Sequence, residues 1–189
     1  GFTLVPLALS LYYSLCEQNL LQPPLFVGWD NYRELTGDAV FRESLGNTLY
    51  YAAMALPAGM LVSLGLALLL NLPIRGQVLY RTIIFLPSLV PVVASAMIWL
   101  WLFNSKLGLI NSLLRMIGVE GPGWLTDARW AMPALAFMSL WGVGHTVVIY
   151  LTGLQDVPVE LYEAAEIDGA GPWRRLWHVT LPMISPVIF

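Results

Sequence analysis

Long apolar stretches without a charged side chain dominate the pattern of this chain. Charged residues are absent from 44–74, 82–105 and 130–155, and also from both ends, 1–16 and 176–189. Each internal stretch exceeds the roughly 20 residues that an α-helix needs to cross the hydrocarbon core of a membrane. Backbone polar groups in lipid must be satisfied internally, and these stretches are too long for barrel strands, so the pattern predicts membrane helices.

These stretches predict an all-α, polytopic membrane helical bundle that forms one transmembrane domain over 1–189. The expected segments are 2–16, 47–70, 81–103, 131–153 and 179–189. The first and last are shorter than a full span, and the chain starts without a Met, so we expect truncation at both ends. Alternate connections share a side of the membrane, which groups 17–46 with 104–130, and 71–80 with 154–178.

Composition agrees with a membrane protein. The chain is 58% hydrophobic and 11% charged, whereas a soluble domain carries roughly 25% charged residues. The net charge of −3 and the lack of a basic stripe give no reason to expect a nucleic-acid partner. Lys and Arg divide almost equally between the two sets of connections, so the positive-inside rule does not orient the chain. The single cysteine excludes an intrachain disulfide and a cysteine zinc site.

The second predicted segment, 47–70, carries several local signals. Small residues recur at every fourth position of the second segment, at Ala55, Gly59, Ser63 and Ala67. They define a face that permits close helix contact, for which packing within the subunit is favoured over contact with a second subunit. Pro57 can kink this helix. Asn47 and Thr48 are interpreted as its cap.

A polar island of about twenty residues separates the last two apolar stretches. It contains Glu163, Ala164 and Ala165, then Gly169 after three residues, and Val-Thr-Leu-Pro at 179–182. Pro158 and Pro172 suit first helical turns, and Gly169 suits a left-handed stop between two helices. The loop 154–178 is therefore predicted to hold two short helices joined by a tight turn. Glu163 and Glu166 can pair with Arg174 and Arg175 inside the loop or across to a partner.

This island resembles the EAA motif (EAA, three residues, Gly, nine residues, Ile-x-Leu-Pro) of permease subunits of bacterial ABC importers, with Val179 in place of Ile. Two further stretches are similar to signatures of carbohydrate permeases of the maltose/glycerol-3-phosphate type, first-subunit kind. They are 26–32, Phe-Val-Gly-Trp-Asp-Asn-Tyr, and 153–158, Gly-Leu-Gln-Asp-Val-Pro. The resemblance implies the type I ABC importer permease fold.

The resemblance implies a transport subunit and not an enzyme. It places the chain in the bacterial cytoplasmic (inner) membrane with 154–178 in the cytoplasm, beside a second permease subunit. Its other implied partners are cytoplasmic ATPase subunits, which bind and hydrolyse ATP, an extracytoplasmic solute-binding protein and membrane lipid. No cofactor, metal or catalytic residue is expected on this chain. The ATPase-coupling residues implied are Glu163, Ala164, Ala165, Asp168, Gly169, Leu181 and Pro182.

The solute pathway is harder to place. His145 is the one ionisable residue inside a predicted span, which makes it a candidate; the bland alternative is a neutral histidine bonded to a neighbouring helix. Ser88, between Pro87 and Pro91, lies where prolines are expected to bend the third segment, either at a wet cavity or for packing alone. Trp141, with Trp99, Trp101 and Phe103, either stacks on a sugar ring or belongs to an interfacial aromatic belt.

Alternative functions remain at this stage. An importer for a non-sugar solute (amino acid, polyamine or anion) shares the EAA loop. A secondary carrier or channel would need ionisable residues along a path, and the predicted spans offer His145 alone. An intramembrane enzyme would need a motif such as His-Glu-x-x-His or Gly-x-Ser-x-Gly, which the sequence lacks.

Overall fold

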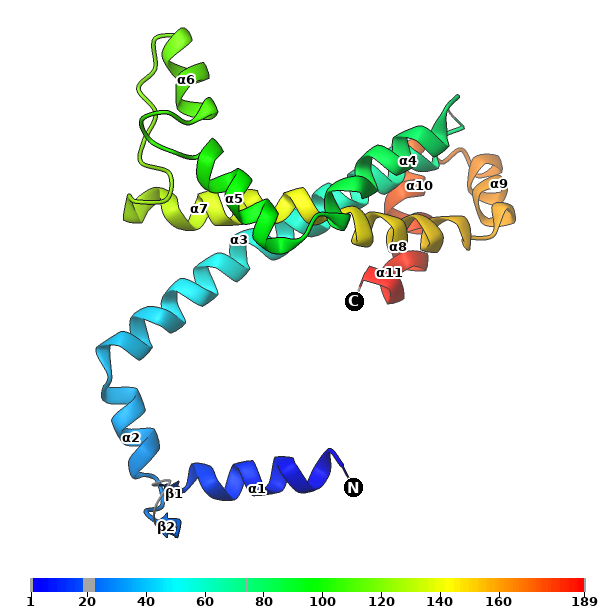
Figure 1. Cartoon of the computed structure of the whole chain (residues 1–189). Helices are drawn as coiled ribbons and strands as arrows, with labels where there is room; N and C mark the ends of the chain where they lie inside the picture. Colours follow the sequence, from blue (N-terminus) through cyan, green and yellow to red (C-terminus); the bar gives the residue numbers. More distant parts are fainter. Residues whose placement is uncertain (1, 19–22, 74, 189) are drawn as a thin grey trace. The chain divides into compact units, whose positions relative to one another are not determined.

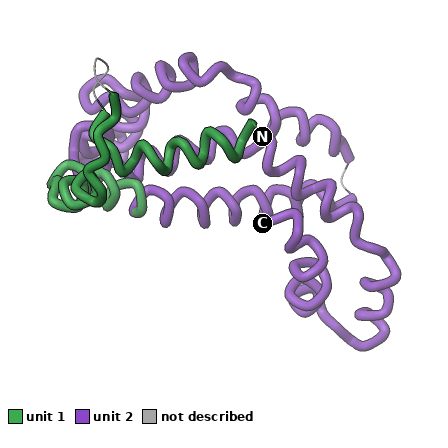
Figure 2. Tube along the Cα trace, turned by 90° about the horizontal axis from the view of Figure 1, so that it is seen from below, with its two compact units in different colours: residues 1–49 green, residues 50–189 purple. Residues whose placement is uncertain are grey.

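The computed structural model describes residues 2–18, 23–73 and 75–188. The chain divides into two compact units, residues 1–49 and 50–189, which Figure 2 colours separately.

The first unit contains two short helices, the first residues of a long helix and a minimal hairpin. Its strands pair antiparallel, with Cys16 opposite Phe26 and Glu17 opposite Leu25. The elements are α1 (Leu4–Ser14), β1 (Cys16–Glu17), β2 (Leu25–Phe26), α2 (Asp30–Gly37) and the beginning of α3 (Ala39–Asn71).

Side chains of the stretch 26–32 hold the chain in place where it leaves the C-terminal end of α1. The Asn31 side-chain amide donates to the backbone carbonyls of Ser14 and Cys16, both at 3.0 Å. The Tyr32 hydroxyl donates to the Ser14 hydroxyl at 2.7 Å. The Asn-Tyr pair of this carbohydrate-permease signature therefore has a structural role here, because it satisfies carbonyls that the helix end leaves without partners.

The second unit consists of helices, several of them short (Figure 1). After the remainder of α3 it contains α4 (Gln77–Phe85), the 3₁₀-helix η1 (Leu86–Leu89), α5 (Val92–Leu102), α6 (Leu109–Met116), α7 (Ala128–Ser139), the 3₁₀-helix η2 (Leu140–Gly142), α8 (Gly144–Gln155), α9 (Val159–Ile167), α10 (Pro172–Arg175), the π-helix η3 (Leu176–Thr180) and α11 (Leu181–Ile188).

Helix α3 is longer than the predicted segment 47–70, so the predicted start and cap were wrong. The Asp38 carboxylate accepts the Val40 N–H at 2.8 Å, which satisfies a backbone donor at the helix start. Thr48 lies inside α3, where its hydroxyl donates to the Ser44 carbonyl at 2.8 Å. The helix continues through Pro57 without a break.

The third and fourth predicted segments are each two helices with a bend between them. The axes of α4–η1 and α5 meet at 93°, and those of α7–η2 and α8 at 55°. The first bend has a proline cause, because Pro91 precedes α5 directly and Val90 before it is extended, with φ −72° and ψ 129°. The sequence predicted a disturbance by Pro87 and Pro91, but not two separate helices.

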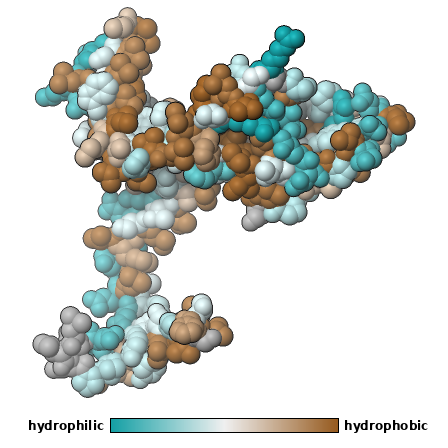
Figure 3. Space-filling view, turned by 45° about the vertical axis from the view of Figure 1, so that its right-hand side comes forward, coloured by the Kyte–Doolittle hydropathy of each residue, from teal (hydrophilic) through white to brown (hydrophobic). Residues whose placement is uncertain are grey.

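Within the described residues, α3 is the one helix that by itself is long and apolar enough to cross a membrane, and the two bent pairs bring the number to three if each is one span. Figure 3 shows hydrophobic side chains, in brown, over much of the visible surface. Large exposed apolar patches of this kind are typical of a surface that contacts lipid or other protein.

The first hydrophobic core lies where the C-terminal half of α3 meets α8 and α11. Ala67 and Val147 are fully buried there, and Ile184 is 1% exposed. On the small-residue face of α3, Ser63 and Ala67 are buried. Packing within the subunit, the favoured interpretation of that face, is therefore confirmed for its C-terminal half.

The second core is aromatic and joins α5 to α7. The Trp99 and Phe103 rings stack with centroids 5.3 Å apart, and Trp99 also meets Trp141 edge-on at 5.8 Å. Trp99 is 8% and Phe103 4% exposed. For these two rings sugar stacking was wrong, because each ring is covered by other side chains, and their place in an interfacial belt stays a prediction. Trp101, by contrast, is 60% exposed.

The connection 104–130 is an ordered structure centred on Asn111, which is 2% exposed. Its amide donates to the carbonyls of Ser105 at 3.0 Å and Pro122 at 3.1 Å, and its oxygen accepts the Trp124 indole N–H at 2.6 Å. One side chain thus holds α6 against the irregular segment that contains Pro122 and Trp124.

Replacing Asn111 by Leu should loosen this loop, because several buried polar groups lose their partner at a cost of about 3 kcal/mol. We expect tryptic cleavage at Arg115 and Arg129 to accelerate roughly 100-fold, since cleavage follows the population of the open loop. Leu113→Ala on the same helix is the control, because the Leu113 side chain is 53% exposed. Equal cleavage of the two variants would contradict this account of the loop.

Candidate functional site

The polar island between α8 and α11 folds into two short helices, as the sequence predicted. Helix α9 covers Val159–Ile167 and α10 covers Pro172–Arg175. Pro172 is the first residue of α10, in agreement with prediction. Pro158 lies one residue earlier than expected, at the N-cap of α9, where its missing N–H is equally harmless. Val157 is 6% exposed and anchors the start of the island in the first core.

The turn between the two helices depends on Gly169, whose φ is +74°. The Ala170 N–H donates to the Ala165 carbonyl at 2.8 Å, and the Gly169 N–H to the Glu166 carbonyl at 3.0 Å. This pair of bonds is the Schellman motif, which needs a left-handed residue at the position of Gly169. Residues other than glycine are disfavoured in that conformation. The predicted left-handed stop is confirmed.

The coupling candidates fall into two groups in space. Glu163, Ala164, Asp168 and Gly169 are exposed on α9 and its turn, and Ala165 is half-buried beside them. The other two candidates, Leu181 and Pro182, belong to α11 and lie outside the α9–α10 segment, residues 159–175, which we call the knob. Leu181 is half-buried against the first core, and Pro182 is exposed.

Several exposed apolar side chains on this knob escaped the sequence analysis. The two most exposed are Ile167 at 88% and Trp173 at 75%. For Ile167 the available signal was its place between the charged residues Glu166 and Asp168. Exposed apolar residues beside small ones form a surface that suits another protein.

Two side-chain bridges cross the turn. Arg175 Nη1 lies 3.2 Å from Glu166 Oε2, and these side chains are 28% and 71% exposed. This pairing inside the loop was one of the two options from the sequence. The Tyr162 hydroxyl lies 3.1 Å from the Thr180 hydroxyl, and Thr180 is 5% exposed. The bridges tie α9 to α10 and to the end of η3.

The π-helix η3 leads directly into α11. Its wider turn is closed by the Leu181 N–H, which donates to the Leu176 carbonyl five residues back. Pro182 follows as the second residue of α11, and the helix continues through it to Ile188. Because proline has no N–H, it cannot continue the normal pattern, and a π turn is a local way to accommodate that loss.

A groove of about 1000 Å³ runs along the same region, between the C-terminal half of α3 and α10–η3. Its walls are mainly apolar, with Tyr162, Arg175 and Thr180 among the few polar residues on them. The hydrogen bond between Tyr162 and Thr180 therefore borders an open groove.

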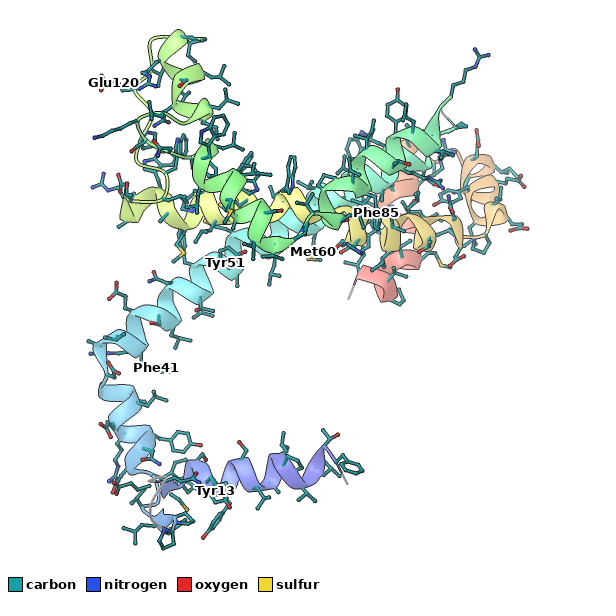
Figure 4. All side chains as sticks on the ribbon, viewed as in Figure 1. Tyr13, Phe41, Tyr51, Met60, Phe85 and Glu120 are labelled. Carbon is teal, nitrogen blue, oxygen red and sulfur yellow. The ribbon has the colours of Figure 1, made fainter. Side chains whose placement is uncertain are left out.

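The three pathway candidates gather around the two bends, which contact each other through η1 and η2. The His145 ring lies 4.9 Å from the ring of Phe85, the residue labelled at the end of α4 in Figure 4. The Ser88 hydroxyl donates to the Phe85 carbonyl at 2.6 Å. Trp141 lies in η2 and packs on Trp99.

Very close backbone packing holds α8 against α4 at this point. A Cβ built on Gly144 would lie 2.8 Å from the Ile84 carbonyl oxygen, 2.9 Å from the Phe85 Cα and 3.0 Å from the Ser88 hydroxyl. Gly144 is buried. The absence of a side chain at 144 is what allows the two bent pairs to meet.

Residues 49–189 match the family described as binding-protein-dependent transport system inner membrane component. The chain belongs to this family. The match begins inside α3 and includes both bent pairs, the knob and α11.

Named relatives in this family are permease proteins of transport systems. The chain is 39% identical over 194 residues to the sn-glycerol-3-phosphate transport system permease protein UgpA of Pectobacterium atrosepticum, covering 100% of this chain and 64% of that one. It is 34% identical over 186 residues to the sulfoquinovosyl glycerol transport system permease protein SmoG of Agrobacterium fabrum, covering 97% and 60%. The chain thus spans about three fifths of the length of these relatives.

A solved structure shares the fold. It is a bacterial ABC transporter involved in the import of the acidic polysaccharide alginate, with a TM-score of 0.81 and 26% identity, covering 98% of this chain and 64% of that one. The same transporter in complex with an alginate-pentasaccharide-bound periplasmic protein gives a TM-score of 0.80. The predicted fold, that of an ABC importer permease, is confirmed.

Proposed function

We propose that this chain is a permease subunit of an ATP-driven, binding-protein-dependent importer, and that its α9 knob receives motion from a separate ATPase. The observation that carries the proposal is the knob itself. It is a short helix closed by a Schellman turn and bridged to the next helix, and it exposes Ala164 and Ile167 outward. A compact helix passes on a rigid-body displacement, which a flexible loop would absorb.

The coupling contacts in this proposal are Glu163, Ala164, Ala165, Asp168 and Gly169, together with the exposed Ile167. Leu181 and Pro182 take a different part, at the point where α11 leaves the knob. The knob would lie in the cytoplasm and the chain in the bacterial cytoplasmic membrane. A second permease subunit would complete the pathway, and an extracytoplasmic binding protein would deliver the solute. ATP would bind to the ATPase subunits.

The solute is proposed to be a sugar or sugar derivative. The support comes from the relatives, whose names specify sulfoquinovosyl glycerol, sn-glycerol-3-phosphate and diacetylchitobiose, and from the alginate importer. The pathway is placed at the meeting point of the two bends, beside His145, Ser88 and Trp141. Bent helices inside a membrane protein are tolerated where they are buried or line a wet cavity.

Uptake by the complete complex in vesicles tests this function. Vesicles that contain the full-length chain, its partner permease and the ATPase should accumulate a labelled sugar only with binding protein outside and ATP inside. The control replaces the sugar by a labelled amino acid. Accumulation by the full-length chain alone, without ATPase or binding protein, would contradict the importer assignment. Accumulation of the amino acid in place of the sugar would contradict the sugar assignment alone.

A further inference from the structure

The backbone that connects α9 to α11 is least constrained between α9 and α10. Between the two short helices lies Gly169-Ala170-Gly171, and glycine imposes little restriction on the backbone. The 6→1 bond of the Schellman turn fixes α9 to Ala170, but the next backbone bond across the turn begins only when Arg175 donates to Gly171 within the second helix. A displacement of α9 that travelled only along the backbone would be partly absorbed here.

The two side-chain bridges bypass this point, and they differ in environment. The Arg175–Glu166 ion pair is largely exposed on its carboxylate side, at 71%. Exposed ion pairs contribute little, because water screens the charges and the long side chains lose freedom. The Tyr162–Thr180 pair joins a half-buried tyrosine to a threonine that is 5% exposed. A hydrogen bond to a buried partner holds its geometry more firmly than an exposed ion pair does.

Thr180 occupies a particular place in the fold. It is the last residue of the π-helix, and α11 begins at the next residue. Its hydroxyl lies 3.3 Å from the Arg175 carbonyl, so it can donate to that carbonyl while it accepts from the Tyr162 hydroxyl. Tyr162 in turn packs on the first core, and the neighbouring Val179 and Leu181 do the same. The pair therefore connects the middle of α9 with the first turn of α11.

We infer that Tyr162 and Thr180 are positioning residues that carry the displacement of α9 to α11 across the Gly169–Gly171 turn. The inference rests on the function proposed above and names the side chains by which that function is transmitted. Motion of α9 moves the Tyr162 hydroxyl, and through Thr180 the π-turn moves with it. Local wide turns within helices occur frequently at functional sites.

Removal of the Thr180 hydroxyl tests the inference. Thr180→Val keeps the size and branching of the side chain and lacks the hydroxyl, so the knob should still fold and the ATPase should still bind. We expect the amount of solute imported per ATP hydrolysed to fall at least fivefold, because the variant loses the hydrogen bond to the Tyr162 hydroxyl, worth about 1 kcal/mol, together with the longer bond to the Arg175 carbonyl. The measurement is uptake and ATP hydrolysis in the same vesicles of the complete complex.

Two further variants separate transmission from structure. Thr180→Ser restores the hydroxyl without the methyl group and should restore the ratio. Tyr162→Phe removes the Tyr162–Thr180 bond and keeps the bond from Thr180 to the Arg175 carbonyl, so it should lower the ratio about fivefold. The double variant should be no worse than Thr180→Val alone, because that variant has already lost the shared bond. Glu166→Gln removes only the exposed ion pair and should change the ratio less than twofold.

The outcomes distinguish this inference from the proposed function. ATP-driven uptake by the wild-type complex with an unchanged ratio in Thr180→Val would overturn the inference and leave the function standing. The same would follow if the serine variant behaved like the valine variant, since the methyl group and not the hydroxyl would then matter. Absence of ATP-driven uptake in the wild-type complex would overturn both.

Discussion

Replacing Gly169 with Asp is expected to uncouple the ATPase while leaving insertion into the membrane intact. Gly169 has a φ of +74° and donates to the Glu166 carbonyl at the end of α9. A side chain in this conformation costs about 1 to 2 kcal/mol, so the Schellman turn opens and the exposed end of α9 moves. We expect ATPase co-purification with the full-length chain to fall at least tenfold, measured on the tagged protein in detergent.

Gly171→Asp is the matched control for this change. It adds the same charge two residues away in the same turn, but Gly171 has an ordinary extended backbone, with φ −69° and ψ 172°. A Cβ at 171 would meet nothing within 4 Å among the described residues. Co-purification should therefore stay near wild type. If both variants lost the ATPase equally, the added charge and not the backbone turn would be responsible, and the turn would lose its assigned role.

The second large effect is expected at Gly144, where α8 packs against α4. In Gly144→Ala the new methyl group would lie 2.8 Å from the Ile84 carbonyl oxygen and 2.9 Å from the Phe85 Cα. Backbone atoms cannot rotate away as a flexible side chain can, so the helices must separate, at a cost of about 3 kcal/mol. We expect the thermal midpoint of the purified full-length chain to drop by about 5 to 10 °C.

Gly142→Ala gives the corresponding control. Gly142 belongs to the same bend, in η2, and in the described part of the chain a Cβ there would meet no atom within 4 Å. This variant should unfold within about 2 °C of the wild type. A stable Gly144→Ala protein would mean that α4 and α8 do not meet as closely as the structure has them.

Composition and motif spacing predicted the class of fold, because charge-free runs longer than 20 residues have few stable alternatives in lipid. They did not predict the bends. Pro87 and Pro91 marked the first bend, but the second, at 140–143, contains no proline, and it depends on packing at Gly144 that a local pattern does not reveal. The early start of α3 was missed because its first turns include Arg42 and Glu43, which hydropathy alone places outside a span.

The knob was more predictable than the pathway. Its caps and stop are local, so Gly169 and Pro172 could be read from the order of residues alone. The burial of Trp99 and Phe103 could not be predicted in this way, because it depends on contacts with α7 and with the far end of the loop that follows α5. The Tyr162–Thr180 bridge was also missed, because neither residue has a charge or motif that marks it.

Cross-linking from α9 tests the central claim most directly, namely that this helix docks on the ATPase. The chain has one cysteine, Cys16, which is buried, with 3% of its surface exposed, and can be replaced by Ser. In that background Ala164→Cys, labelled with a maleimide that carries a photoreactive benzophenone and then irradiated, should give a covalent adduct whose second component mass spectrometry identifies as the ATPase. Met116→Cys, 81% exposed in the connection predicted on the opposite side, should give none. An Ala164→Cys chain that is labelled by the maleimide but never joined to the ATPase would contradict the account.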